Sequence, residues 1–161
     1  MKLEKAIFAC GCFWGAQYQF EHAKGVVRST VGYIGGHKEH PAYEEVKAHT
    51  TGHAEATLVE FDAEQTSFTE LCKLFFEIHD PAQTDGQGPD IGPQYRSEIF
   101  YLNDKQKEEA EAVIVLLKEK GYEVNTKLTP ATTFWEGEEY HQHYYDKTGG
   151  EPYCHIRIKK F

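Results

Sequence analysis

The stretch EKAIFACGCFWGAQYQFEHAKG, residues 4–25, joins an apolar run to a helical pattern through a cysteine and glycine segment. Its first part, residues 4–10, is a short apolar run that predicts a β-strand. Apolar residues then recur at helical spacing until Gly25 ends the pattern. The sequence therefore predicts a strand that turns into a helix at Gly11, with Cys12 at or just before the first helical turn.

The same patterns continue through the rest of the chain. Further strands are predicted at residues 26–34, 55–62, 97–102, 123–129 and 155–160, and helices at residues 67–78, 104–120 and 138–147. Loops are predicted over residues 35–53 and 81–96. This mixed order predicts an α+β fold, a two-layer sandwich with helices packed on a mixed β-sheet (ferredoxin-like), with long loops and a mobile C-terminal segment.

Length and charge limit the classes of protein to consider. A chain of 161 residues is one domain's worth, so we expect a single domain over residues 1–161 that removes roughly 70% of its unfolded surface from water. A net charge of −9 argues against a nucleic-acid partner, because such a partner needs clustered Lys and Arg. No stretch approaches the roughly 20 apolar residues of a membrane span. A monomer is expected.

Cysteine usage indicates the compartment. The four cysteines are sparse and irregularly spaced compared with a disulfide scaffold. Nothing near the start resembles a signal peptide, because charged residues precede a short apolar run. The sequence therefore predicts a cytoplasmic protein in which the cysteines are free thiols, core residues or redox groups.

Cys12 has the features of a reactive thiol. A helix N-terminus lowers the pKa of a thiol from about 8.5 toward roughly 3.5 to 7.5. Gly11 and Gly15 would let backbone or substrate approach the sulfur, and Phe13 with Trp14 would supply an apolar wall. The alternative is that Cys12 is a small buried hydrophobe among core rings. The pattern alone leaves both open.

Blocks of sequence along nearly the whole chain carry a resemblance. They are GCFWG (11–15), GYIGG (32–36), PAYEEV (41–46), TGHAEA (51–56), GPDIGPQYRS (88–97) and TFWEGEEYHQHY (133–144). In content and order they resemble the peptide methionine sulfoxide reductase A family. The resemblance implies thiol-dependent reduction of methionine-(S)-sulfoxide, free and in proteins, to methionine, and thus repair of proteins after oxidative stress.

The resemblance also implies site residues. Cys12 matches the family's nucleophile, and Phe13 and Trp14 match the pocket for the substrate methyl group. Glu55 is the candidate general acid. At a pKa near 4.3 only about one glutamate in 500 is protonated at pH 7, so a useful acid must be buried. Without the resemblance, the residues alone favour a glutamate that caps a strand in solvent.

Further positions match groups that the family uses to hydrogen-bond the polarised oxygen, namely Tyr43, Asp90 and Tyr95. The residues alone favour loop packing for the tyrosines and a turn for Asp90. Cys154 matches the family's C-terminal resolving cysteine, which implies a Cys12–Cys154 disulfide that thioredoxin or a similar dithiol resets. No cofactor and no metal are required, because sulfur alone cycles.

Several features depart from the family or suggest rivals. The family usually has glycine at Cys10 and glutamate at Gln17, and a different segment before Cys154. Cys72 is expected in the core. The histidines of HQH (141–143) suggest a metal site, but no pair of cysteines has the C-x2–4-C spacing typical of zinc ligands. Another thiol enzyme, such as a peroxidase or a transferase, is the second rival.

Overall fold

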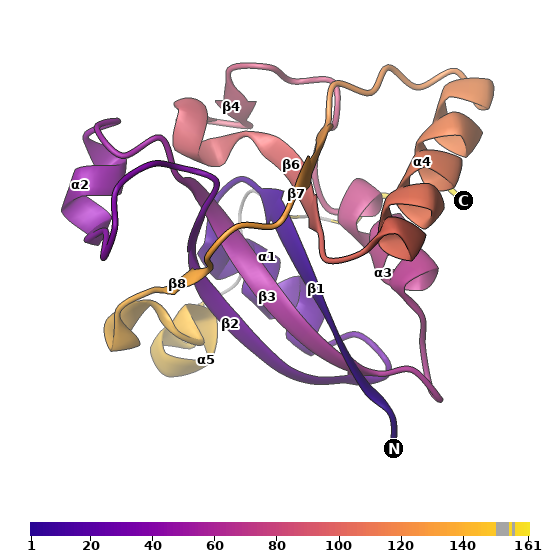
Figure 1. Ribbon diagram of the computed structural model, residues 1–161, viewed down its shortest axis with the longest axis horizontal. Coiled ribbons are helices and arrows are strands. Elements are labelled where there is room, and N and C mark those ends of the chain that lie inside the picture. Colours follow the sequence, from indigo (N-terminus) through magenta and orange to yellow (C-terminus); the bar gives the residue numbers. More distant parts are fainter. Residues whose placement is uncertain (151–154, 156) are drawn as a thin grey trace.

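The predicted strand, turn and helix form the start of the fold as β1 (Leu3–Cys10) and α1 (Phe13–Glu21). The computed structural model describes residues 1–150, 155 and 157–161 (Figure 1). Between β1 and α1, Gly11 has a φ of +101°, which favours glycine, and a Cβ there would lie 2.7 Å from the Cβ of Gln87. The turn that delivers Cys12 to the helix start therefore requires Gly11.

The sheet has six strands in the order β7-β6-β1-β3-β2-β8. The other five are β2 (Val26–Ile34), β3 (Ala54–Asp62), β6 (Ser97–Tyr101), β7 (Lys127–Pro130) and β8 (Trp135–Glu136). All neighbours pair antiparallel except β6 and β7, which are parallel. Together with α1 and α3 (Phe68–Glu77), the strands β1, β2, β3 and β6 follow the β-α-β-β-α-β order of a ferredoxin-like sandwich. The predicted α+β class and mixed sheet are confirmed.

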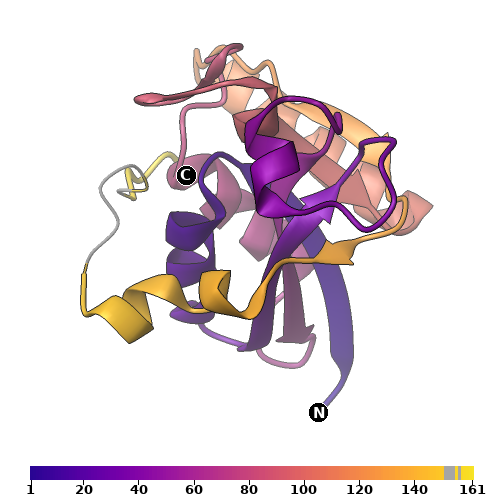
Figure 2. The same ribbon diagram turned by 90° about the vertical axis from the view of Figure 1, so that its left-hand side faces the viewer.

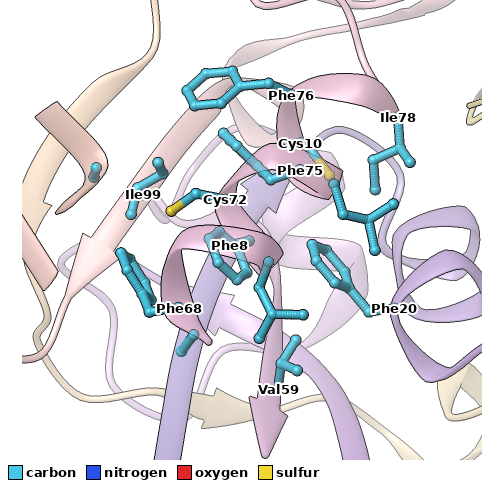
Figure 3. Close-up of a cluster of buried hydrophobic side chains, with 14 of the residues drawn as sticks. Phe8, Cys10, Phe20, Val59, Phe68, Cys72, Phe75, Phe76, Ile78 and Ile99 are labelled. Atoms are coloured by element: carbon cyan, nitrogen blue, oxygen red, sulfur yellow. The ribbon is translucent and has the colours of Figure 1, made fainter. Parts of the chain in front are cut away.

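The main hydrophobic core joins one face of the sheet to α1, α3 and α4 (Asp104–Glu119). Phe8 of β1 stacks against Phe20 of α1 and against Phe68 and Phe75 of α3, at ring-centroid distances of 5.1 to 5.8 Å (Figure 3). Cys72 lies in this cluster, as expected, and burial raises the pKa of its thiol well above the ordinary value. This core holds α1 against the sheet.

The opposite face of the sheet is covered in part by the segment between β7 and β8. Ile7, Ala9 and Phe100 form a second cluster there, and Phe134 packs against it. The segment between β7 and β8 carries Phe134 and crosses the front of the sheet in Figure 1. Among the described helices, none is long and apolar enough to cross a bilayer.

The predicted loops contain short elements that the sequence did not reveal. They are α2 (Tyr43–Lys47), the hairpin of β4 (Gly86–Gln87) and β5 (Asp90–Ile91), and a 3-10 turn at Pro93–Tyr95. The helix predicted over residues 138–147 is a 3-10 turn, Glu139–His141, followed by α5 (Tyr144–Thr148). In Figure 2, α2, β8 and α5 lie together on the side facing the viewer.

Two predicted strands are wrong, wholly or in part. Of residues 123–129, only those from Lys127 belong to a strand, because Asn125 bonds instead to the carbonyl oxygens of Pro81 and Ala82. The described residues 155 and 157–160 form no strand. A helix end holds this segment instead, since Ile158 N–H donates to the carbonyl oxygen of Glu77 at 2.8 Å.

Candidate active site

Cys12 lies immediately before α1, at the position that caps the helix. Its carbonyl oxygen accepts a bond from the N–H of Ala16 at 3.3 Å, which closes the first helical turn. The side chain and backbone together are only 7% exposed. The first N–H groups of a helix have no partners within the helix and attract negative charge. The sulfur of Cys12 therefore lies where an anion is favoured.

Glu55 reaches the same helix end from the sheet. On β3 it pairs in register with Tyr33 of β2, and it is 2% exposed. Its Oε1 accepts a hydrogen bond from the N–H of Phe13, the first residue of α1, at 3.2 Å. Two residues that are 42 positions apart along the chain, Phe13 and Glu55, are thereby joined. The carboxyl group and the Cys12 thiol share one helix start.

Burial raises the pKa of Glu55 well above its ordinary value. The nearby charges of Cys12 and Asp90 raise it further, and the bond from Phe13 N–H opposes the shift. Two acidic groups in one dry site do not both ionise readily, because their negative charges repel each other. The arrangement favours a proton on Glu55, beside the Cys12 thiol at the same helix end.

The two candidate tyrosines and Asp90 surround this pair. Tyr43 is on α2, Tyr95 ends the 3-10 turn, and Asp90 is on β5; all three are half-buried. Burial, with the charges of Glu55 and Cys12, raises the pKa of Tyr43 to about 12. Burial and then the charge of Glu55 also raise the pKa of Tyr95. Both phenols are therefore protonated hydrogen-bond donors at neutral pH.

The two rings after Cys12 have different surroundings. Phe13 is 1% exposed, and its ring centroid lies 5.7 Å from that of Tyr33 and 6.4 Å from that of Tyr43. Trp14 is half-buried and stacks on Tyr144 at a centroid distance of 3.9 Å and an angle of 10°. The Phe13 ring thus lies beside Tyr43, and the backbone N–H of Phe13 contacts Glu55.

The site combines a thiol, a buried carboxyl group, phenol donors and aromatic rings. Residues 4–161 match the family described as peptide methionine sulfoxide reductase. The chain belongs to this family. Among its relatives, a peptide methionine sulfoxide reductase MsrA of Acinetobacter baumannii (strain AYE) is 44% identical, covering 97% of this chain and 90% of that protein. One of Geobacter sulfurreducens is 48% identical, covering 92% and 93%.

Solved structures agree with the family assignment. The crystal structure of Mxr1 from Saccharomyces cerevisiae in reduced form is 33% identical, with a TM-score of 0.89 over 97% of this chain and 92% of that chain. Mxr1 has also been solved in complex with Trx2. That structure is 24% identical, with a TM-score of 0.64 over 98% of this chain and 91% of that chain, and supports the fold.

Two residues support the site in a role that the sequence did not predict. Glu138 accepts bonds from the Tyr33 hydroxyl at 2.8 Å and from the Tyr43 N–H at 3.0 Å. The Nδ1 of His141 accepts a bond from the Trp14 indole N–H at 2.9 Å. Both lie in the TFWEGEEYHQHY block, but no local pattern in that block indicates which residues they contact.

The Glu138→Ala variant is expected to lower the free energy of unfolding by about 2 to 4 kcal/mol, because it leaves the buried Tyr33 hydroxyl and the Tyr43 N–H without their acceptor. The matched control is Glu139→Ala, since Glu139 is exposed and its side chain pairs with Lys147 at the surface. That change should cost less than about 1 kcal/mol. Urea unfolding of both variants measures the difference; equal losses would contradict the assignment.

The departures from the family pattern also have structural settings. Gln17 is buried, and its amide donates to the carbonyl oxygen of Ser29 while its Oε1 accepts the N–H of His143. An amide serves both bonds, whereas an ionised glutamate would only accept. Cys10 is buried in the main core. Cys154 lies outside the described residues, so its pairing with Cys12 stays a prediction.

The histidines of the HQH segment separate in space. His141 packs on Phe13 with ring centroids 5.2 Å apart. The Nδ1 of His143 lies 2.6 Å from a carboxylate oxygen of Glu21, and the ligand atoms of His143, Glu21 and Asp146 are within 4.8 Å of one another. Hydrogen bonding between His143 and Glu21 explains this cluster without a metal ion.

Proposed function

We propose that the chain reduces methionine-(S)-sulfoxide, free and in proteins, to methionine, and so repairs oxidised proteins. The observation that carries this proposal is the contact of Cys12 and a buried Glu55 with one helix start. A sulfoxide is a poor electrophile until its oxygen receives a proton or a strong hydrogen bond. The family assignment supports the choice of substrate.

In the first step, the Cys12 sulfur attacks the sulfoxide sulfur while Glu55 supplies a proton to the oxygen. The hydroxyl group then moves to the Cys12 sulfur while the S–S and S–O bonds to the methionine sulfur break, so methionine leaves and Cys12 becomes a sulfenic acid. Tyr43, Tyr95 and Asp90 would orient the polar oxygen. Phe13 and Trp14 would enclose the methyl group, which keeps it away from water.

In the second step, the Cys154 thiol attacks the sulfenic acid sulfur of Cys12. A disulfide forms between Cys12 and Cys154, the S–O bond breaks, and water leaves. An external dithiol then reduces the disulfide, and thioredoxin or a similar protein fits this role. Such a cycle needs a reducing compartment, and we place the protein in the cytoplasm as a single domain over residues 1–161.

The test mixes reduced enzyme with one resolved epimer of methionine sulfoxide at a time and counts the thiols that are lost. We expect about two thiols lost per methionine formed with the S form and none with the R form. In Cys154→Ser the cycle should stop after a single turnover. Equal reduction of both epimers, or no methionine from either, would refute the proposal.

The same preparation distinguishes the rival thiol chemistry. A peroxidase would turn over hydrogen peroxide in preference to a sulfoxide, because its site stabilises a leaving hydroxide. Hydrogen peroxide has no methyl group for the aromatic rings to bind. Treatment with a chelator addresses a metal-dependent reaction. We expect sulfoxide reduction to be faster than peroxide turnover and to be unaffected by the chelator.

A further inference from the structure

His155 follows Cys154 directly in the sequence, and its side chain is enclosed. It is 0% exposed, and its Nε2 lies 2.7 Å from the carbonyl oxygen of Cys10, the last residue of β1. A carbonyl oxygen only accepts hydrogen bonds, so Nε2 carries the proton. The imidazole therefore ties the C-terminal segment to the strand end that leads into Cys12.

The first turn of α1 leaves room for this imidazole. A Cβ on Gly15 would lie 2.5 Å from the Nδ1 of His155 and 3.1 Å from its Cγ. A Cβ on Gly11 would lie 3.6 Å from its Cε1. Further along α1, the Gln19 amide donates to the carbonyl oxygen of His155. The glycine at position 15 is thus explained by the close approach of His155, on the helix that Cys12 begins.

A second anchor holds the chain after His155. Glu77, at the end of α3, is 3% exposed. Its carboxylate accepts the Arg157 Nε–H and the Lys160 backbone N–H, each at 3.0 Å. The segment that follows Cys154 is therefore attached to α1 through His155 and to α3 through Glu77.

We propose that His155, by docking beside Gly15, is a positioning residue for the resolving step, in which the thiol of Cys154, its neighbour in sequence, reacts with the oxidised sulfur of Cys12. This inference rests on the proposed function. The step itself forms the S–S bond, breaks the S–O bond of the sulfenic acid and releases water. Docking acts by raising the effective concentration of one thiol at the other sulfur.

The test separates the two halves of the cycle by rapid quenching of a single turnover. In His155→Ala, methionine formation in the first turnover should stay within about twofold of the wild-type rate, while disulfide formation slows by about tenfold or more. The sulfenic acid should accumulate and be trapped by dimedone. His155→Gln should restore most of the rate, because its amide can donate to the Cys10 carbonyl oxygen.

Two further variants keep the test decisive. Gln19→Ala removes the bond from a half-buried helix position to the carbonyl oxygen of His155, and it should also slow disulfide formation. His22→Ala is the matched control, because His22 is exposed at the C-terminal end of α1 and its bond within the described residues is to the carbonyl oxygen of Tyr18. Disulfide formation at the wild-type rate in folded His155→Ala, or in Gln19→Ala if the first variant does not fold, would overturn the proposal.

When hydrogen peroxide replaces the sulfoxide as the oxidant, the rate of disulfide formation can be measured without sulfoxide reduction. Peroxide converts the Cys12 thiol to a sulfenic acid and releases water, and the same disulfide then forms. Slow disulfide formation in His155→Ala under peroxide, with no methionine formed from sulfoxide by the wild-type chain, would refute the proposed function and leave the role of His155 standing. Normal methionine formation by the wild-type chain, with an unchanged rate of disulfide formation in His155→Ala, would refute the role of His155 and leave the proposed function standing.

Discussion

The Cys12→Ser variant is expected to form methionine at least about 10⁴-fold more slowly than the wild-type chain. Serine has nearly the same size, so the helix start and the bond from Phe13 N–H to Glu55 should persist. The hydroxyl, however, does not ionise at neutral pH and is a far weaker nucleophile than a thiolate. Methionine released from the S epimer, measured by chromatography, gives the rate.

The control for this variant is Cys72→Ala. Cys72 lies in the main core between α3 and the sheet, away from the helix start. Its removal should lower stability through a small cavity, with the rate per folded molecule unchanged. If Cys12→Ser retained more than about one hundredth of the rate, the nucleophile would have to be another residue.

The second large effect is expected for Glu55→Gln, which should reduce the rate by about 10² to 10⁴-fold. The amide keeps the shape of the carboxyl group, and its oxygen can still accept the Phe13 N–H. It has no acidic proton to deliver to the sulfoxide oxygen. Single-turnover methionine formation measures the loss, and a rate within about threefold of wild type would exclude Glu55 as the acid.

The pH dependence gives an independent readout of the same group. Because burial raises the pKa of Glu55, the group stays protonated well above its ordinary range. The wild-type rate should therefore fall as pH rises through this raised pKa, since the acid is then lost. Glu55→Gln has no such group, so its residual rate should lack this alkaline decrease.

Glu55→Gln should lower the rate but raise the free energy of unfolding at high pH. A carboxyl whose pKa is higher in the folded than in the unfolded chain stabilises the fold fully below the unfolded pKa, and that contribution disappears as pH rises through the folded pKa. Glu55→Gln avoids the buried charge altogether. Its free energy of unfolding relative to wild type should thus increase with pH, as urea unfolding at several pH values would measure.

Local sequence patterns predicted the regular elements well where all residues of an element follow the same strand or helix periodicity. The strand over residues 26–34 matches β2, and the helix over residues 104–120 matches α4 to within one residue. Patterns failed where distant groups decide the backbone. The alternating residues 155–160 look like a strand, but the buried carboxylate of Glu77 holds that segment on a helix end.

The candidate site divides in the same way. Residue order alone places Cys12 at a helix start, because Gly11 and the helical spacing after it are local features. The candidates Tyr43, Glu55, Asp90 and Tyr95 depended on the resemblance to the family. Glu138 and His155 were missed because their partners are 95 and 145 positions away along the chain.

By itself the sequence determined the strand, turn and helix around Cys12, the α+β class and the set of reactive groups that the chain carries. Tertiary structure alone decided which of these groups meet. Pairing of β2 with β3, and packing of α1 on the sheet, bring Glu55 to the Phe13 N–H and remove it from water. The physical reason is that a pKa depends on burial and neighbouring charge, and both are properties of contacts between distant parts of the chain.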